Sequence, residues 1–181
     1  SDRQPEFTQV DMEMSFVNEE DVMSMTEKLV AHVFKEIKGI EIELPLKRME
    51  YDDAMKYYGS DKPDLRFDMK ITDVKDIFKD SEFKVFSNAL DEKSTIACIK
   101  VDDNATYFSR KKTDELTEFV KIYKAKGLPF VKYENKEFTG GISKFLSDKE
   151  KEGLVKELEL KDNDILFFGA DNKMVINETL G

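Results

Sequence analysis

The chain has 181 residues, of which 40% are hydrophobic and 38% charged, and its formal net charge of −10 gives a pI near 4.8. This composition is typical of a globular protein with one large or two small domains. It has neither a long apolar run nor a signal-like start, which predicts a cytoplasmic protein without a membrane span. The acidic charge argues against broad binding of a nucleic-acid backbone, so any RNA contact must be local.

The segment 4–16, QPEFTQVDMEMSF, has the two-residue period of a β-strand. Its apolar face consists of Val10, Met12, Met14 and Phe16, and its other face consists of Phe7, Gln9, Asp11, Glu13 and Ser15. Burial of the apolar face would contribute roughly 1.5–3 kcal/mol for each side chain. A strand with a solvated polar face explains the pattern. A surface that binds an amine and a flat ring explains it as well, and the residues leave both readings open.

The next residues predict a helix, a short strand and a second helix. Asn18 is the expected N-cap of the first helix, which carries an apolar stripe and ends at Gly39. A strand is expected at 40–44 and a helix at 51–58. The single histidine, His32, has no partner at ligand spacing, so no metal site is predicted.

Short helices and strands alternate from residue 71 onward. Helices are predicted at 71–80, 109–127, 143–158 and 171–181, and strands at 82–86, 94–101, 128–134 and 164–170. The expected helix caps are Ser109 and Asp171. The order of elements predicts an α+β domain with a mostly antiparallel sheet and helices on one face. Cys98 lies within an apolar strand and is expected to be a buried, inert thiol.

No catalytic set can be assembled from these residues. The sequence has no Ser-His-Asp arrangement, no phosphate-binding Gly-rich loop and no cysteine-based metal pattern. The strongest local basic cluster is Arg110, Lys111 and Lys112, at the start of a predicted helix. It predicts an RNA contact, with a solvated helix face as the alternative.

Three blocks, in chain order, resemble parts of bacterial-type aspartyl-tRNA synthetases, which are class II aminoacyl-tRNA synthetases. The segment DRQPEFTQVDMEMSFV resembles the second half of motif 2, and YDDAMKYYGSDKPDLRF resembles the segment before the insertion domain. The segments FVKIYKAKGL, SKFL and FFGADNK resemble the insertion itself, the GAD domain. The resemblance implies that residues 1–70 are a strand, helix and connector of the catalytic domain and that residues 71–181 are the GAD domain.

The resemblance also implies roles for the polar face of segment 4–16. In class II synthetases this strand lies on the floor of the site where ATP and the amino acid react. Gln4 would contact ATP and Phe7 would stack on the adenine ring. Gln9 and Asp11 would face the aspartate substrate, where a carboxylate can bind its ammonium group. Glu13 is a weaker candidate for the same face.

The same likeness implies that the chain is a fragment. The first half of motif 2, motifs 1 and 3 and the anticodon-binding barrel have no counterpart in it. The parent would be a homodimeric ligase that joins L-aspartate to tRNA(Asp), or also to tRNA(Asn), through an aspartyl adenylate, using ATP and Mg²⁺. The chain alone is expected to be inactive, to bind neither cofactor, and to be a monomer or a weak edge-strand dimer.

The sequence is compatible with two other functions. The chain could be the insertion domain of a tRNA-dependent amidotransferase, although the motif 2 strand belongs to the synthetases. It could also be a stand-alone module whose acidic surface binds a basic protein.

Overall fold

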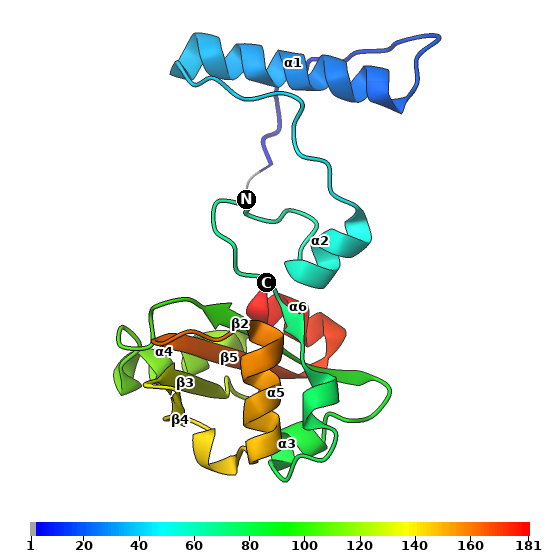
Figure 1. Ribbon diagram of the computed structural model, residues 1–181. Helices are drawn as coiled ribbons and strands as arrows, with labels where there is room; N and C mark the ends of the chain where they lie inside the picture. The colour runs from blue at the N-terminus through cyan, green and yellow to red at the C-terminus, as the bar shows by residue number, and fades with distance from the viewer. Residues whose placement is uncertain (1–2) are drawn as a thin grey trace. The chain divides into compact units, whose positions relative to one another are not determined.

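The computed structural model describes residues 3–181, which divide into two compact units, one ending at Arg48 and the other beginning at Met49 (Figure 1). The first unit contains the long helix α1 (Glu19–Lys38), and the second contains every other helix and strand. Backbone hydrogen bonds join the segment after Met49 to the rest of the second unit. One runs from the Ile71 N–H to the Tyr57 carbonyl at 2.7 Å. The domain boundary at residue 70 stays a prediction, since it concerns domains of a longer parent.

Helix α1 forms where the sequence predicts it, because its end signals are local. The Asn18 side chain accepts the Asp21 N–H at 3.1 Å, and the Asp21 carboxylate accepts the Asn18 N–H at 3.0 Å. This reciprocal pair satisfies two of the free donors of the first turn. Gly39, with φ 66°, ends the helix in the left-handed conformation.

The strand predicted at 4–16 is wrong for this chain, and so is the short strand at 40–44. Both segments are irregular, because neither has a neighbouring strand in the described part of the chain to accept and donate its backbone hydrogen bonds. The apolar side chains of the first segment are accordingly exposed, from 43% at Met14 to 75% at Val10 and fully at Phe16.

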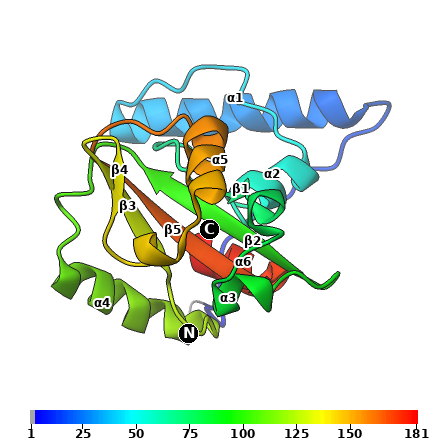
Figure 2. The same cartoon turned by 60° about the horizontal axis from the view of Figure 1, so that its bottom comes forward.

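The second unit is built on an antiparallel sheet with the order β1-β2-β5-β3-β4 (Figure 2). Its strands are β1 (Thr72–Asp73), β2 (Ser94–Val101), β3 (Phe130–Glu134), β4 (Glu137–Thr139) and β5 (Asp164–Asn172). The central strands β2 and β5 pair over the whole of β2, from Ser94 opposite Asn172 to Val101 opposite Ile165. The predicted α+β class and antiparallel sheet are confirmed.

The α-helices of this unit are α2 (Tyr51–Tyr57), α3 (Lys84–Ser87), α4 (Arg110–Val120), α5 (Asp148–Leu158) and α6 (Lys173–Leu180). Single 3-10 turns lie at Lys75–Phe78, Lys121–Tyr123 and Ser143–Phe145. Figure 1 shows α5 crossing in front of the sheet. No helix within residues 3–181 is long and apolar enough to span a membrane.

Both faces of the sheet are covered, whereas the sequence predicted helices on one face. On one face Phe168 packs with Phe86 of α3 and Leu154 of α5. On the other face Phe167 packs with Ile176 and Leu180, both of α6. The physical reason is the continuous apolar run of β5, since a strand that is buried on both sides needs apolar residues at every position.

Three local predictions differ from the structure. Residues 82–86, predicted as a strand, lead into α3, because Phe83 and Phe86 lie three residues apart and their rings meet at 5.0 Å. Residues 71–80, predicted as a helix, form β1 and a 3-10 turn. The cap of α6 is Asn172 and not Asp171, because α6 begins at Lys173 and the Asn172 side chain accepts the Val175 N–H at 3.1 Å.

Cys98 lies fully buried on β2, and this burial raises the pKa of its thiol far above the ordinary value of 9.0. We expect the native thiol to be unreactive toward a disulfide reagent at pH 8 and fully reactive in denaturant, because only the thiolate attacks. The unfolded thiol ionises above about pH 9 while the native one stays protonated, so stability should fall as the pH rises past that point. Rapid titration of the native thiol would contradict the burial.

Candidate functional site

The four residues proposed for the adenylate site lie on the irregular segment before α1. Gln4, Phe7, Gln9 and Asp11 are all exposed, with Phe7 at 76%. The part of the chain that the structure describes gives none of them a side-chain hydrogen bond or an ion pair. Within residues 3–181 these side chains are therefore open to solvent, and their roles stay a prediction.

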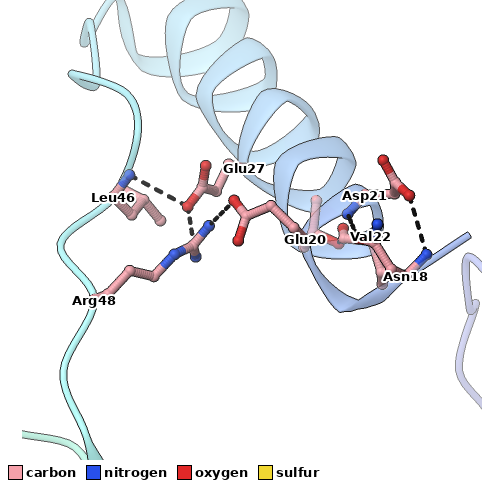
Figure 3. A network of polar contacts seen from close by, with 8 residues as sticks. Asn18, Glu20, Asp21, Val22, Glu27, Leu46 and Arg48 are labelled. Carbon is pink, nitrogen blue, oxygen red and sulfur yellow. Dashed lines mark hydrogen bonds and ion pairs between the residues drawn. The ribbon is translucent and has the colours of Figure 1, made fainter.

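The first unit contains an ion pair between a buried carboxylate and an exposed guanidinium, which the sequence did not predict. Glu27 of α1 is 7% exposed; its carboxylate forms an ion pair with Arg48 at 2.8 Å and accepts a hydrogen bond from the Leu46 N–H at 3.3 Å (Figure 3). Arg48 also reaches Glu20, two turns earlier on the same face of α1, at 2.9 Å (Figure 3). These contacts hold residues 46–48 against α1. The available signal was an acid with apolar residues, Met23 and Val30, at i−4 and i+3 on the same helix.

The basic triplet at the start of α4 does not act as one cluster. Lys111 lies 3.8 Å from Glu115 of the next turn, and the Lys112 ammonium lies over the ring of Tyr107. Arg110 has no acid within ion-pair distance among residues 3–181. Successive residues of a helix point about 100° apart, so the three charges diverge.

Arg110 instead shares a cleft with two lysines that lie far away in the sequence. The cleft has a volume of about 740 Å³ and brings together Arg110, Lys132 of β3 and Lys144 of the 3-10 turn. Phe108 and Phe130 also line it, as do the acids Asp114 and Glu134. Glu134 is engaged by the Thr139 hydroxyl, which donates to it at 2.7 Å. Lys132 and Lys144 could not be found from sequence, because only the fold brings them to Arg110.

The carboxyl groups with shifted pKa values are structural. A side-chain hydrogen bond from Arg66 lowers the pKa of Asp64 to about 2, and the backbone N–H of Lys93 is the main cause of the lowered pKa of Asp91. Both are exposed groups that close local turns. They stay ionised at neutral pH, which does not suit a general acid.

Residues 3–181 also contain no group of three or more His, Cys, Asp or Glu side chains placed to hold a metal ion. The extended segment that carries Asp11 and Glu13 does not bring further carboxylates to them. These residues therefore do not fit a Mg²⁺ site by themselves.

The match to a known family covers four of the five strands, β2 to β5, and the helices α4 to α6. The sequence model of the GAD domain family matches residues 86–180, from α3 to the end of α6. This chain belongs to the GAD domain family. The matched residues include β2 to β5, the cleft at Arg110 and the buried Cys98.

Similarity to full-length proteins extends over the whole chain. Aspartate-tRNA ligase of Bacillus licheniformis is 50% identical over 181 residues, covering 100% of this chain and 31% of the relative. Aspartate-tRNA ligase of Lactococcus lactis is 51% identical over 180 residues, covering 99% of this chain and 30% of the relative. Aspartate-tRNA(Asp/Asn) ligase of Bacillus subtilis is 50% identical over 181 residues, covering 100% and 31%. The chain thus spans less than a third of the length of these relatives, and the resemblance seen in the sequence is confirmed.

Glu27→Ala should weaken the attachment of residues 46–48 to α1. It removes the acceptor of the Leu46 N–H and leaves Arg48 without its buried partner, which costs about 1–3 kcal/mol. We expect amide exchange at Leu46, followed by NMR, to accelerate by about 5- to 100-fold.

The matched control is Glu20→Ala, which removes only the exposed partner of Arg48 and should change exchange at Leu46 by less than about fivefold. Equal effects of the two substitutions would show that burial of Glu27 does not matter.

Proposed function

We propose that this chain is part of an aspartate-tRNA ligase, which joins L-aspartate to tRNA in the cytoplasm by way of an aspartyl adenylate. One observation carries the proposal, namely identity of about 50% to ligases along the whole chain, including the residues before the GAD match. An isolated GAD domain shared with another enzyme would not explain the similarity of residues 1–70. The acidic-module alternative does not explain it either.

Within the parent, the segment before α1 would line the site of adenylate formation. The proposed contacts are those of Gln4 and Phe7 with ATP and of Gln9 and Asp11 with aspartate. Pairing with a neighbouring strand would turn the exposed segment into the two-faced strand expected from its sequence, burying Val10, Met12, Met14 and Phe16. The polar face would then present Phe7 as a flat surface for adenine.

Adenylate formation also needs cations that neutralise the phosphates of ATP. The Mg²⁺ of the reaction and the clamping arginine would be held by the remaining part of the parent. This chain offers an aromatic ring, amides and carboxylates on that face, so it would position substrates without neutralising phosphate charge.

The purified chain should therefore show no aspartate-dependent exchange of pyrophosphate into ATP. The control is a full-length ligase that carries the same segment, which should exchange, and whose Phe7→Ala variant should lose affinity for ATP by about 1–3 kcal/mol through lost ring stacking. If Phe7→Ala left the Michaelis constant for ATP unchanged, Phe7 would not stack on adenine. If the chain alone catalysed pyrophosphate exchange, it would contain all the groups that adenylate formation needs.

A contact with tRNA is proposed at the start of α4, where the sequence predicted one at Arg110, Lys111 and Lys112. The cleft supports Arg110 most strongly, since it lies with Lys132 and Lys144 beside two aromatic rings. Cations that can approach one phosphate group, next to aromatic side chains, are typical of nucleic-acid contacts. Lys111 and Lys112 already have partners within the chain.

Substitution should separate these roles. In a full-length ligase, Arg110→Ala should weaken tRNA binding and make the dependence of log K on log salt shallower by about 1, because one phosphate contact is lost. Lys111→Ala, which removes the same charge from the neighbouring position, should leave the slope unchanged. The measurement is tRNA binding at several salt concentrations, and identical slopes for wild type and Arg110→Ala would exclude the contact.

A further inference from the structure

The central strand β5 continues beyond its neighbour β3. Its pairing with β2 extends to Asn172, but its pairing with β3 ends where Phe167 meets Phe130. The chain before β3 makes one more contact, from the Phe168 N–H to the Pro129 carbonyl at 2.8 Å, and then turns away. The last residues of β5 therefore form a sheet edge, just before the chain enters α6 (Figure 2).

The backbone of Ala170 points into this open edge. Along an antiparallel strand the N–H and C=O groups of alternate residues point to the same side. Ala170 therefore faces the same side as Phe168, whose N–H points toward Pro129 and away from β2. The hydrogen bonds of β2 support this orientation. Ile96 is paired with Ala170, and its carbonyl points away from β5, where it accepts the Val74 N–H at 2.9 Å.

Within the described residues, neither the N–H nor the C=O of Ala170 has a hydrogen-bond partner outside the β2 ladder. Its geometry directs both groups away from that ladder. A free donor and a free acceptor thus stand side by side at the edge.

These groups open onto a cavity of about 240 Å³ between the end of β5, α3, α6 and residues 125–129. Its apolar wall includes Val85, Ala89, Val175 and Ile176. That volume exceeds the roughly 150 Å³ of a cavity that holds a benzene ring, so a small side chain with part of a backbone fits.

One charged pair borders the cavity. The Asp171 side chain is 21% exposed, and its Oδ1 accepts the Asn172 N–H at 2.8 Å. Its Oδ2 lies 3.6 Å from the ammonium of Lys126, which is beyond a good hydrogen bond. The Lys126 side chain is 89% exposed and can move away at little cost, so Oδ2 is available to another ammonium group.

We propose that this cavity binds the amino terminus of a short peptide with small apolar side chains. The terminal ammonium binds Asp171 Oδ2, the N–H and C=O of the second peptide residue pair with the C=O and N–H of Ala170 as an added antiparallel strand, and an apolar side chain enters the cavity. Edge-strand addition combined with capture of a terminal amine is an established mode of peptide recognition. The inference is independent of the ligase proposal, because it uses only groups of the GAD domain.

The chemistry favours a peptide over other small ligands. An anion would meet the Asp171 carboxylate, and a hydrocarbon would leave the donor and acceptor of Ala170 unpaired. A simple amine would bind Asp171 but could not satisfy Ala170. A peptide amino terminus supplies an ammonium group, a donor, an acceptor and an apolar side chain in one extended unit.

The experiment is an NMR titration of the ¹⁵N-labelled full chain with the tripeptide Ala-Ala-Ala. We expect saturable shifts at the amides of Ala170 and Asp171, and N-acetylation of the tripeptide should weaken binding at least about fivefold, as for loss of a charged hydrogen bond. Alanine amide, which carries the ammonium but a single amide group, should bind more weakly than the tripeptide. Equal affinity of the free and acetylated tripeptides, or the absence of shifts at Ala170, would overturn the proposal.

Two variants make the result specific. Asp171→Asn should reproduce the effect of acetylation, whereas Glu178→Gln, the same change of charge at an exposed position of α6, should bind like the wild type. Gly127 borders the cavity, has no positive φ, and a Cβ there would meet nothing within 4 Å. Gly127→Leu should therefore add an apolar side chain at the border of the cavity without straining the backbone, and should weaken binding. Unchanged binding by Gly127→Leu, with a native-like spectrum, would place the peptide elsewhere.

Discussion

The pairing of β2 with β5 is the interaction on which the rest of the GAD domain depends. It sets the face on which each apolar side chain of the two strands lies, and thereby defines two separate cores. Each fully buried Ile, Leu or Phe contributes roughly 1.5–3 kcal/mol, and these two strands supply many of them. A slip of one residue would exchange Phe167 with Phe168 between cores of different shape, so the register is strongly determined.

Elements whose signals are local could be predicted from the sequence. The helices that begin at Glu19 and Arg110 have their caps, Asn18 and Ser109, directly before them, and the apolar runs of β2 and β5 are long enough to identify. Elements that need a neighbouring strand for their hydrogen bonds could not be predicted in this way. Segment 4–16 has the alternation of a strand but no strand beside it among residues 3–181, and β1 is too short to show any period.

The candidate sites could be predicted only in part, because they too depend on residues that the fold brings together from distant parts of the sequence. Adjacent basic residues in a sequence indicated one cluster at Arg110, Lys111 and Lys112, but the geometry of a helix turns them in different directions. The partners of Arg110 come from β3 and from the turn after β4, which no sequence pattern connects to it. The open edge at Ala170 was equally hidden, because alanine carries no chemical signal and its significance is entirely in its backbone groups.

The strand order also has a consequence for synthesis on the ribosome. Strand β5 lies at the centre of the sheet but is the last of the five strands in the chain, so the ladder joins Ser94 to Asn172 across almost eighty residues. Until β5 leaves the exit tunnel, β2 and β3 have no common neighbour, and Phe78, Phe86 and Val131 have nothing to cover them. Formation of the sheet must therefore await nearly the whole GAD segment. The nascent chain would be most open to chaperones over that interval, while α1, capped at both ends by nearby residues, has its local signals complete far earlier.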